Sequence, residues 1–101
     1  MYDNGQGVTK DESEAVKWFR KAAEQDVAAA QFNLALKYFH GKGVPKDYTE
    51  SYKWLLLCSA QNYEKAKKTV PALERDMTRE QMAEGQKLAR EFKPLSNSQA
   101  N

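Results

Sequence analysis

The chain has 101 residues, 41% hydrophobic and 30% charged, which is the size and composition of one soluble globular domain. Its 16 basic and 14 acidic residues leave a formal net charge of +2, which favours neither nucleic acid nor an anionic membrane as a partner. No apolar run approaches the roughly 20 residues of a membrane-spanning helix, and the N-terminus has no signal-peptide pattern, so the compartment stays undetermined.

The single cysteine and the single histidine argue against several kinds of site. Cys58 lies in the apolar stretch WLLLCSA and cannot form an internal disulfide, so we expect a buried, inert thiol. His40 has no second histidine or cysteine with which to share a metal ion. Because no nucleophile–base pair is visible either, the sequence predicts no catalytic residue, no metal and no cofactor.

Two stretches of eleven residues are similar, NGQGVTKDESE at 4–14 and HGKGVPKDYTE at 40–50, and we call them the two copies of a repeated phrase. A shift of 36 residues aligns 2–26 with 38–62 and gives ten identities without a gap. The identical pairs are Tyr2 with Tyr38, Gly5 with Gly41, Gly7 with Gly43, Val8 with Val44, Lys10 with Lys46, Asp11 with Asp47, Glu14 with Glu50, Lys17 with Lys53, Trp18 with Trp54 and Gln25 with Gln61. A period in the thirties is typical of stacked helical hairpins.

The first complete helix predicted in chain order follows the first copy of the phrase. Asp11 reads as its N-cap, with Glu14 as the capping-box partner, and the helix ends near Gln25. An apolar stripe at helical spacing follows the cap: Ala15, Trp18, Phe19, Ala22 and Ala23. We therefore expect Trp18 to pack in the core, like its counterpart Trp54, and we expect G-x-G-V to be a loop.

The second copy of the phrase joins two further predicted helices. Residues 27–40 are rich in alanine and leucine and contain no helix breaker, so they predict a helix, with Gly41 as a left-handed C-cap. Asp47, paired with Glu50, then predicts the start of a helix that ends near Gln61. Gly43 is expected to turn the chain between these helices.

Two more helices are predicted in the last third of the chain. Residues 63–75 begin like the helix at 27–40, but Pro71 predicts a kink or a break. Thr78, with Gln81 as its capping-box partner, begins a last helix that runs to about Phe92 and carries one apolar stripe. We expect this helix to cap the C-terminal end and the polar tail at 94–101 to be disordered.

The repeated residues resemble the Sel-one-like repeat (SLR) family, a relative of the tetratricopeptide repeats with a longer loop between its helices. The resemblance rests on Ala30, Leu34, Ala35, Tyr38, Gly41, Gly43, Val44, Asp47, Ser51, Trp54, Cys58 and Ser59, and on the first-copy residues Tyr2, Gly5, Gly7, Val8, Asp11, Ala15, Trp18, Ala22 and Ala23. Ala35 stands where the family has glycine, and the last helix resembles the closing helix of bacterial members.

This resemblance covers about residues 2–92 and implies an all-α superhelix. Such a fold is a right-handed solenoid of antiparallel helical hairpins, here with about two and a half repeats and a C-terminal capping helix. We divide the chain into a partial repeat at 1–26 (loop and second helix), a complete repeat at 27–62, a degenerate third repeat with the capping helix at 63–93, and the tail at 94–101.

The resemblance also implies an adaptor that catalyses nothing and binds a partner protein or peptide on its concave surface. By similarity to tetratricopeptide helices, Phe32, Leu36 and Phe39 face that groove, and packing against neighbouring helices is the alternative. Asn33, together with Lys65 and Lys68 of the next repeat, would suit an acidic or C-terminal carboxylate. The alternative is that Asn33 binds backbone and that the lysines form a solvated face.

Other functions stay open. The G-x-G-V phrase lacks the residues of a phosphate-binding loop and follows a helix, so it reads as a connector. A hydrolase, as once proposed for cysteine-rich relatives, is one alternative, although this chain lacks their cysteine pairs. A structural piece of a longer solenoid is another. The helix that carries Trp18 and Phe19 lacks a partner helix before it, so we expect self-association through the N-terminal end.

Overall fold

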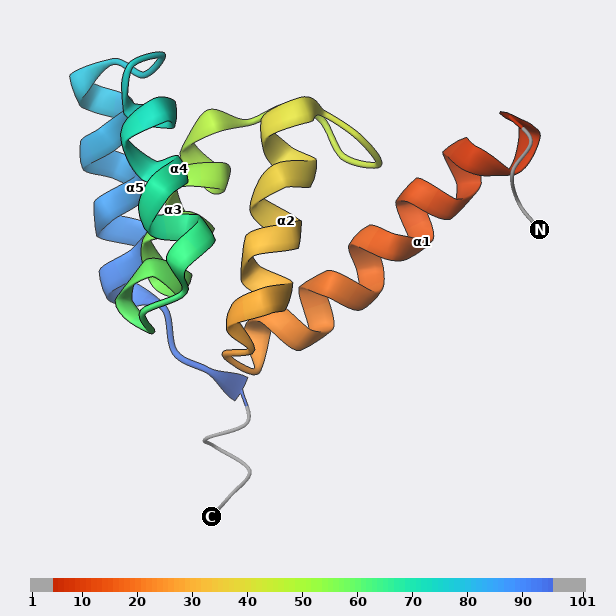
Figure 1. The fold of residues 1–101 in the computed structure, drawn as a ribbon, viewed down its shortest axis with the longest axis horizontal. Coiled ribbons are helices and arrows are strands. Elements are labelled where there is room, and N and C mark those ends of the chain that lie inside the picture. Colours follow the sequence, from red (N-terminus) through yellow and green to blue (C-terminus); the bar gives the residue numbers. More distant parts are fainter. Residues whose placement is uncertain (1–4, 96–101) are drawn as a thin grey trace.

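The computed structural model describes residues 5–95, with side chains from Asp11 onward. Within this range the regular structure is helical and no strand occurs, which confirms the predicted all-α class (Figure 1). The helices are α1 (Gly5–Glu24), α2 (Ala28–His40), α3 (Tyr48–Ala60), α4 (Glu64–Glu74) and α5 (Arg79–Glu91). Tyr2 and most of the predicted tail at 94–101 lie outside the described residues.

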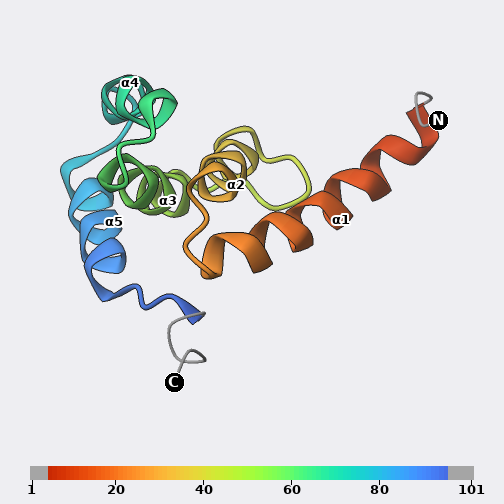
Figure 2. The same cartoon turned by 60° about the horizontal axis from the view of Figure 1, so that its bottom comes forward.

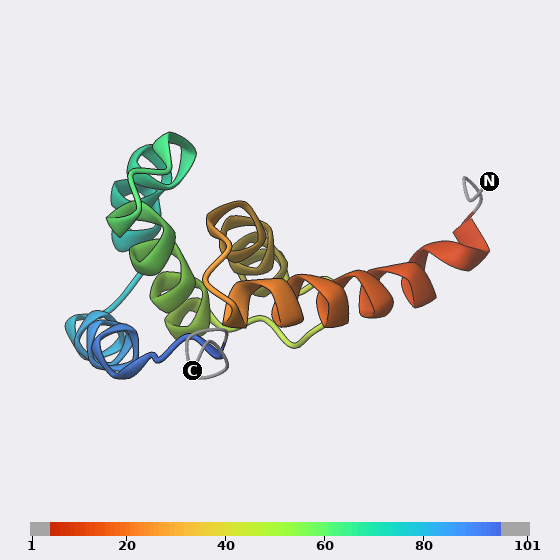
Figure 3. The ribbon, with the colours of Figure 1, turned by 90° about the horizontal axis from the view of Figure 1, so that it is seen from below.

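An antiparallel hairpin of α2 and α3 forms the centre of the molecule (Figure 1). On one side α1 packs against α2, and its N-terminal part projects away from the other helices (Figure 2). On the other side α4 and α5 each pack against α3, and they lie on opposite sides of it (Figure 3). The helix α3 is therefore covered by three helices, whereas α1 is covered by one.

The turn between one hairpin and the next is the same in both repeats. Asp26 has a φ of 69° and Asn62, 36 residues later, has a φ of 66°. Aspartate and asparagine tolerate this left-handed region better than most residues. The Gln61 amide nitrogen joins the two turns, since it donates to the Asp26 carbonyl oxygen (3.1 Å) and to Oε1 of Gln31 (3.2 Å). Gln61 thus fastens successive repeats to each other.

The loop between α2 and α3 has the predicted caps, but Glu50 does not complete the predicted capping box, because the Asp47 N–H donates to the Tyr38 carbonyl (3.0 Å) instead. Gly41 is the left-handed C-cap of α2, with φ 70° and ψ 40°, and its N–H donates to the carbonyl of Lys37. Asp47 is the N-cap of α3, and its Oδ1 accepts from the Glu50 N–H (3.1 Å). Gly43 has a φ of 83° and lies so close to α1 that an added Cβ would stand 2.6 Å from the carbonyl oxygen of Glu12.

The first copy of the phrase does not form this loop, so the prediction for residues 4–14 is wrong where the structure describes them. The helix α1 begins at Gly5 and runs through Gly7 and Asp11, which is therefore not an N-cap. The second loop is held by neighbours, including the bond from Asp47 N–H to the Tyr38 carbonyl (3.0 Å). In the first copy the equivalent residues form helical hydrogen bonds instead, because a glycine inside a helix costs only about 1 kcal/mol relative to alanine.

The core lies around α3. Trp54, at 1% exposure, packs edge-on against the ring of Phe92, with centroids 5.4 Å apart, as its predicted core position requires. Trp18 is 63% exposed, so the prediction that it also packs in the core is wrong. The reason is that α1 has a helix on only one of its sides, and Trp18 lies outside that contact.

The last two helices match their predicted positions. Pro71 does not break α4, which continues to Glu74, because the proline lies exposed in the last turn and removes one backbone hydrogen bond only. Thr78 and Gln81 form the predicted capping box of α5. Gly85 lets α5 approach α3 closely, since a Cβ there would stand 2.7 Å from Cδ2 of Tyr52.

Candidate functional site

Two hollows lie on either side of α2. The first, which we call the α1–α2 hollow, has a volume of about 550 Å³. Its lining residues are Glu12, Phe19, Asn33, Leu36, Lys37, His40 and Lys42. The second, the α2–α4 hollow, lies over α3 and has a volume of about 370 Å³. Its lining residues are Leu36, Phe39, His40, Ser51, Leu55, Thr69, Ala72, Leu73, Arg75 and Asp76.

The two hollows occupy equivalent positions in successive repeats. The period of 36 residues carries Phe19, Asn33, Leu36, Lys37 and His40 of the first onto Leu55, Thr69, Ala72, Leu73 and Asp76 of the second. The α2–α4 hollow has one further wall, which is α2 itself. In the described structure no helix supplies the matching wall of the α1–α2 hollow.

Leu36 and His40 belong to both hollows. They lie one turn apart on α2 and form a ridge from which one hollow opens on each side. We call the two hollows with this ridge the groove surface. It is one continuous surface that spans two repeats.

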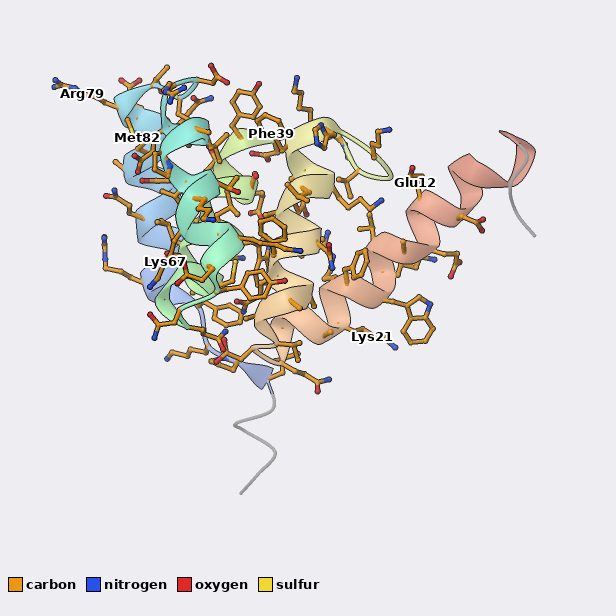
Figure 4. All side chains as sticks on the ribbon, in the orientation of Figure 1. Glu12, Lys21, Phe39, Lys67, Arg79 and Met82 are labelled. Atoms are coloured by element: carbon orange, nitrogen blue, oxygen red, sulfur yellow. The ribbon has the colours of Figure 1, made fainter. Side chains whose placement is uncertain are left out.

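The α1–α2 hollow has a mixed polar and apolar lining and contains a cross-helix ion pair. Nζ of Lys37 lies 2.5 Å from Oε1 of Glu12, and Figure 4 shows Glu12 on the stretch of α1 beside the α2–α3 loop. The hydrogen bond from Lys37 lowers the pKa of the Glu12 carboxyl, helped by the charges of Lys37 and Lys42. A second bond across these helices runs from the Arg20 guanidinium to the Tyr38 hydroxyl (2.6 Å).

The α2–α4 hollow is mostly apolar. Leu36, Phe39, Leu55, Ala72 and Leu73 supply its apolar walls and floor. Its two hydroxyl groups are already engaged: Ser51 donates to the Ala35 carbonyl (2.8 Å) and Thr69 to the Lys65 carbonyl (2.7 Å). Phe39, labelled near the end of α2 in Figure 4, stacks on Tyr48 with centroids 5.5 Å apart.

The residues predicted to bind a partner fall into two groups. Asn33, Leu36 and Phe39 line the hollows, while Phe32 is half-buried with its ring 5.4 Å from that of Tyr63. Lys65 and Lys68 are exposed on α4 and are not among the residues that line either hollow. Asn33 lines the hollow on the α1 side, which is not lined by α4.

Sequence reasoning missed several residues of the groove surface. Thr69 and Ala72 lie 36 residues after Asn33 and Leu36, so the repeat carried a signal that would have found them. Glu12 and Lys37 are 25 residues apart and follow no repeat or motif. Only the packing of α1 on α2 brings them together.

The described residues offer little for catalysis or metal binding. Between residues 5 and 95, no group of three or more histidine, cysteine, aspartate or glutamate residues is placed to hold a metal ion. Burial raises the pKa of the Cys58 thiol to about 11, so it stays protonated at neutral pH and is a poor nucleophile. No helix in the described part of the chain is long and apolar enough to cross a membrane.

Comparison with known proteins agrees with the period and the fold. The family model described as Sel1 repeat matches residues 1–27 and again residues 28–63. The chain belongs to the Sel1 repeat family. Repeats of this family generally form non-enzymatic scaffolds that bind proteins. None of the curated proteins that were compared matches the chain.

A solved structure shows the same Sel1 repeat architecture. It is the crystal structure of c5321, a protective antigen of uropathogenic Escherichia coli strains that displays an SLR fold. The similarity has a TM-score of 0.80 at 32% sequence identity and covers 95% of this chain. The chain spans 21% of the length of that structure. The predicted family and the predicted helical-repeat solenoid are thereby confirmed.

Proposed function

We propose that this Sel1 repeat chain is an interaction module that binds a segment of a partner protein across the groove surface and catalyses no reaction. The observation that carries the proposal is the continuity of the two hollows through Leu36 and His40. One extended segment lying across α2 would contact both hollows at once. Asn33, Leu36 and Phe39 would then be its contacts on α2, and Phe32, one turn before Leu36 and outside both hollows, would extend them.

Lys65 and Lys68 would extend this contact along α4. In a helix, residues four apart share a face, so Lys65 lies in line with Thr69 and Lys68 with Ala72. Both lysines are exposed, and neither takes part in an ion pair among the described residues, whereas their neighbour Lys67 pairs with Glu64 (3.9 Å). We propose that they attract an acidic side chain or a C-terminal carboxylate of the partner.

Affinity capture followed by quantitative mass spectrometry tests the proposal. Leu36→Glu places a charge on the ridge shared by both hollows, so we expect loss of the partners that the wild type retains. Val27→Glu is the control, because it makes the same kind of change at an exposed apolar residue outside both hollows. Circular dichroism confirms that both variants are folded. Equal capture by all three chains would contradict the proposal.

The exposed face of α1 supports a second proposal, which is self-association. Trp18 is 63% exposed, so burying its indole ring against another molecule would be favourable. We propose that this face of α1, outside the groove surface, binds a second copy of the chain. Sedimentation should show an oligomer that Trp18→Glu dissociates. A monomer at every accessible concentration would contradict self-association and leave the groove proposal untouched.

A further inference from the structure

We infer that the groove surface selects its partner by two side chains: a bulky apolar side chain that enters the α2–α4 hollow and an acidic side chain that binds in the α1–α2 hollow. The inference rests on the proposed function, because it takes the partner to lie across the ridge of Leu36 and His40. It adds the chemistry of the segment that is recognised.

The α2–α4 hollow suits an apolar side chain. Leu36, Leu55 and Leu73 line its interior, and the hydroxyl groups of Ser51 and Thr69 already donate to backbone carbonyls. A leucine or phenylalanine side chain would be taken out of water there without breaking a hydrogen bond of the protein. A charged side chain would lose its hydration there, and it would meet both Arg75 and Asp76, whose opposite charges leave no net attraction for either sign.

The α1–α2 hollow suits an acidic side chain. Its charged residues are Glu12, Lys37 and Lys42, so it holds two cations and one carboxylate. Glu12 and Lys37 neutralise each other at 2.5 Å, while Lys42 has no ion pair among the described residues. The side-chain amide of Asn33 adds a hydrogen-bond donor in the same hollow. An incoming carboxylate would be attracted by Lys42, whereas an incoming cation would be repelled by it.

The contrast between the hollows comes from divergence of the two repeats at equivalent positions. Lys37 stands in the first hollow where Leu73 stands in the second, and Asn33 stands where Thr69 stands. The period therefore places an acid-binding and an apolar hollow side by side. Because they share one ridge, their positions on either side of α2 set the separation of the two side chains in the partner.

Selection from a phage-displayed library of random dodecapeptides identifies the preferred segment. We expect the enriched peptides to share a leucine, phenylalanine or similar residue and an aspartate or glutamate at fixed separation. An enriched peptide is then synthesised with an amidated C-terminus, which removes the terminal carboxylate. Its affinity for the folded chain is measured by fluorescence anisotropy, with alanine at the apolar and at the acidic position as two further peptides.

Two variants of the chain test the two hollows separately. Ala72→Glu puts a charge into the α2–α4 hollow, and we expect it to weaken binding about tenfold or more, as does alanine at the peptide's apolar position. Lys42→Glu should weaken binding roughly fivefold, and a peptide whose acidic residue is replaced by lysine should bind this variant better than the original peptide does. Ala83→Glu and Lys87→Glu, exposed on α5, are the matched controls and should bind like the wild type.

The possible results separate the two claims. One result is that the peptides bind more weakly to Leu36→Glu and yet keep their affinity when their apolar or acidic residue is replaced by alanine. That result would overturn the inferred selection by two side chains and support the proposed function. Peptides that bind Leu36→Glu, Ala72→Glu and Lys42→Glu with the affinity of the wild type would overturn both the inference and the proposed function. A library that yields no enriched peptide would do the same.

Discussion

Trp18 and Trp54 occupy the same position of successive repeats, and their surroundings are opposite. Trp54 is 1% exposed and lies against Phe92, whereas Trp18 is 63% exposed. The Nζ of Lys21, which is labelled on α1 in Figure 4, lies over the Trp18 ring, 5.0 Å from the centroid. The difference follows from the number of helices packed on α3 and on α1. Position within the repeat therefore does not determine burial.

Alanine substitutions of the two tryptophans should have very different effects. Trp54→Ala opens a cavity in the core and should lower the free energy of unfolding by about 3–5 kcal/mol. Trp18→Ala, at the surface, should change the free energy of unfolding by no more than about 0.5 kcal/mol. Urea denaturation followed by circular dichroism measures both, and similar losses would show that α1 is packed differently.

Trp54→Phe refines this comparison. The indole Nε1 of Trp54 is buried and has no hydrogen-bond acceptor among the described residues. Phenylalanine removes that donor along with part of the ring, so we expect a smaller loss than for Trp54→Ala. The same denaturation experiment decides this point.

Gly43→Ala should destabilise the chain more than Gly41→Ala. Both glycines have positive φ, of 83° and 70°, which costs any other residue roughly 1–2 kcal/mol. At Gly43 the new Cβ would also stand 2.6 Å from the Glu12 carbonyl oxygen, so α1 must move. At Gly41 the nearest atom is 3.2 Å away. Equal midpoints in urea would contradict the close approach of α1.

The ion pair between Glu12 and Lys37 should weaken in acid. The pKa of Glu12 is lowered in the folded chain, chiefly by the hydrogen bond from Lys37. A lowered carboxyl pKa means that the ion pair contributes fully above the carboxyl's ordinary pKa and is lost as the pH falls through the lowered value. Carboxyl NMR titration should give Glu12 a pKa below the ordinary glutamate value. In Lys37→Met this pKa should return towards the ordinary value. An unchanged titration in Lys37→Met would refute the pairing.

Cys58 should make stability depend on pH in the alkaline range. Its pKa is raised by burial from 9.0 to about 11, so between these values the unfolded chain releases this proton and the folded chain keeps it. Stability therefore falls as the pH rises from about 9 to about 11. Urea denaturation across this range should show a steeper fall for the wild type than for Cys58→Ala. Parallel curves would mean that the thiol ionises normally.

The proposed contact of Lys65 and Lys68 with an acidic partner has its own test. Lys65→Glu with Lys68→Glu should reduce capture of acidic partners, and the reduction should shrink at high salt because exposed charges are screened. Lys87→Glu with Arg90→Glu makes the same change of charge on α5 and serves as the control. Binding that is unchanged for every identified partner would exclude the lysines from the site.

Much of the candidate site was predictable, and the part that was not depends on contacts between helices. Leu36 and Phe39 were predicted from helical spacing together with the similarity to tetratricopeptide helices, and Asn33 from that similarity alone; all three line the hollows. Glu12, Lys37 and Lys42 carry no pattern, since the ion pair and the hollow exist only where α1 crosses α2. The exact position of Lys65 and Lys68 relative to the groove likewise depends on how α4 is rotated.

The sequence by itself determined the helices, the caps at Gly41, Asp47 and Thr78, the period and the family. These features are local, because a cap or an apolar stripe is complete within a few turns of one helix. Tertiary structure alone decided that the first G-x-G-V is helical, that Trp18 is exposed, and that two hollows of different character share one ridge. Each of these outcomes depends on which helices pack against the segment in question. The free energy of that packing depends on residues far apart in the sequence, so no single segment determines it.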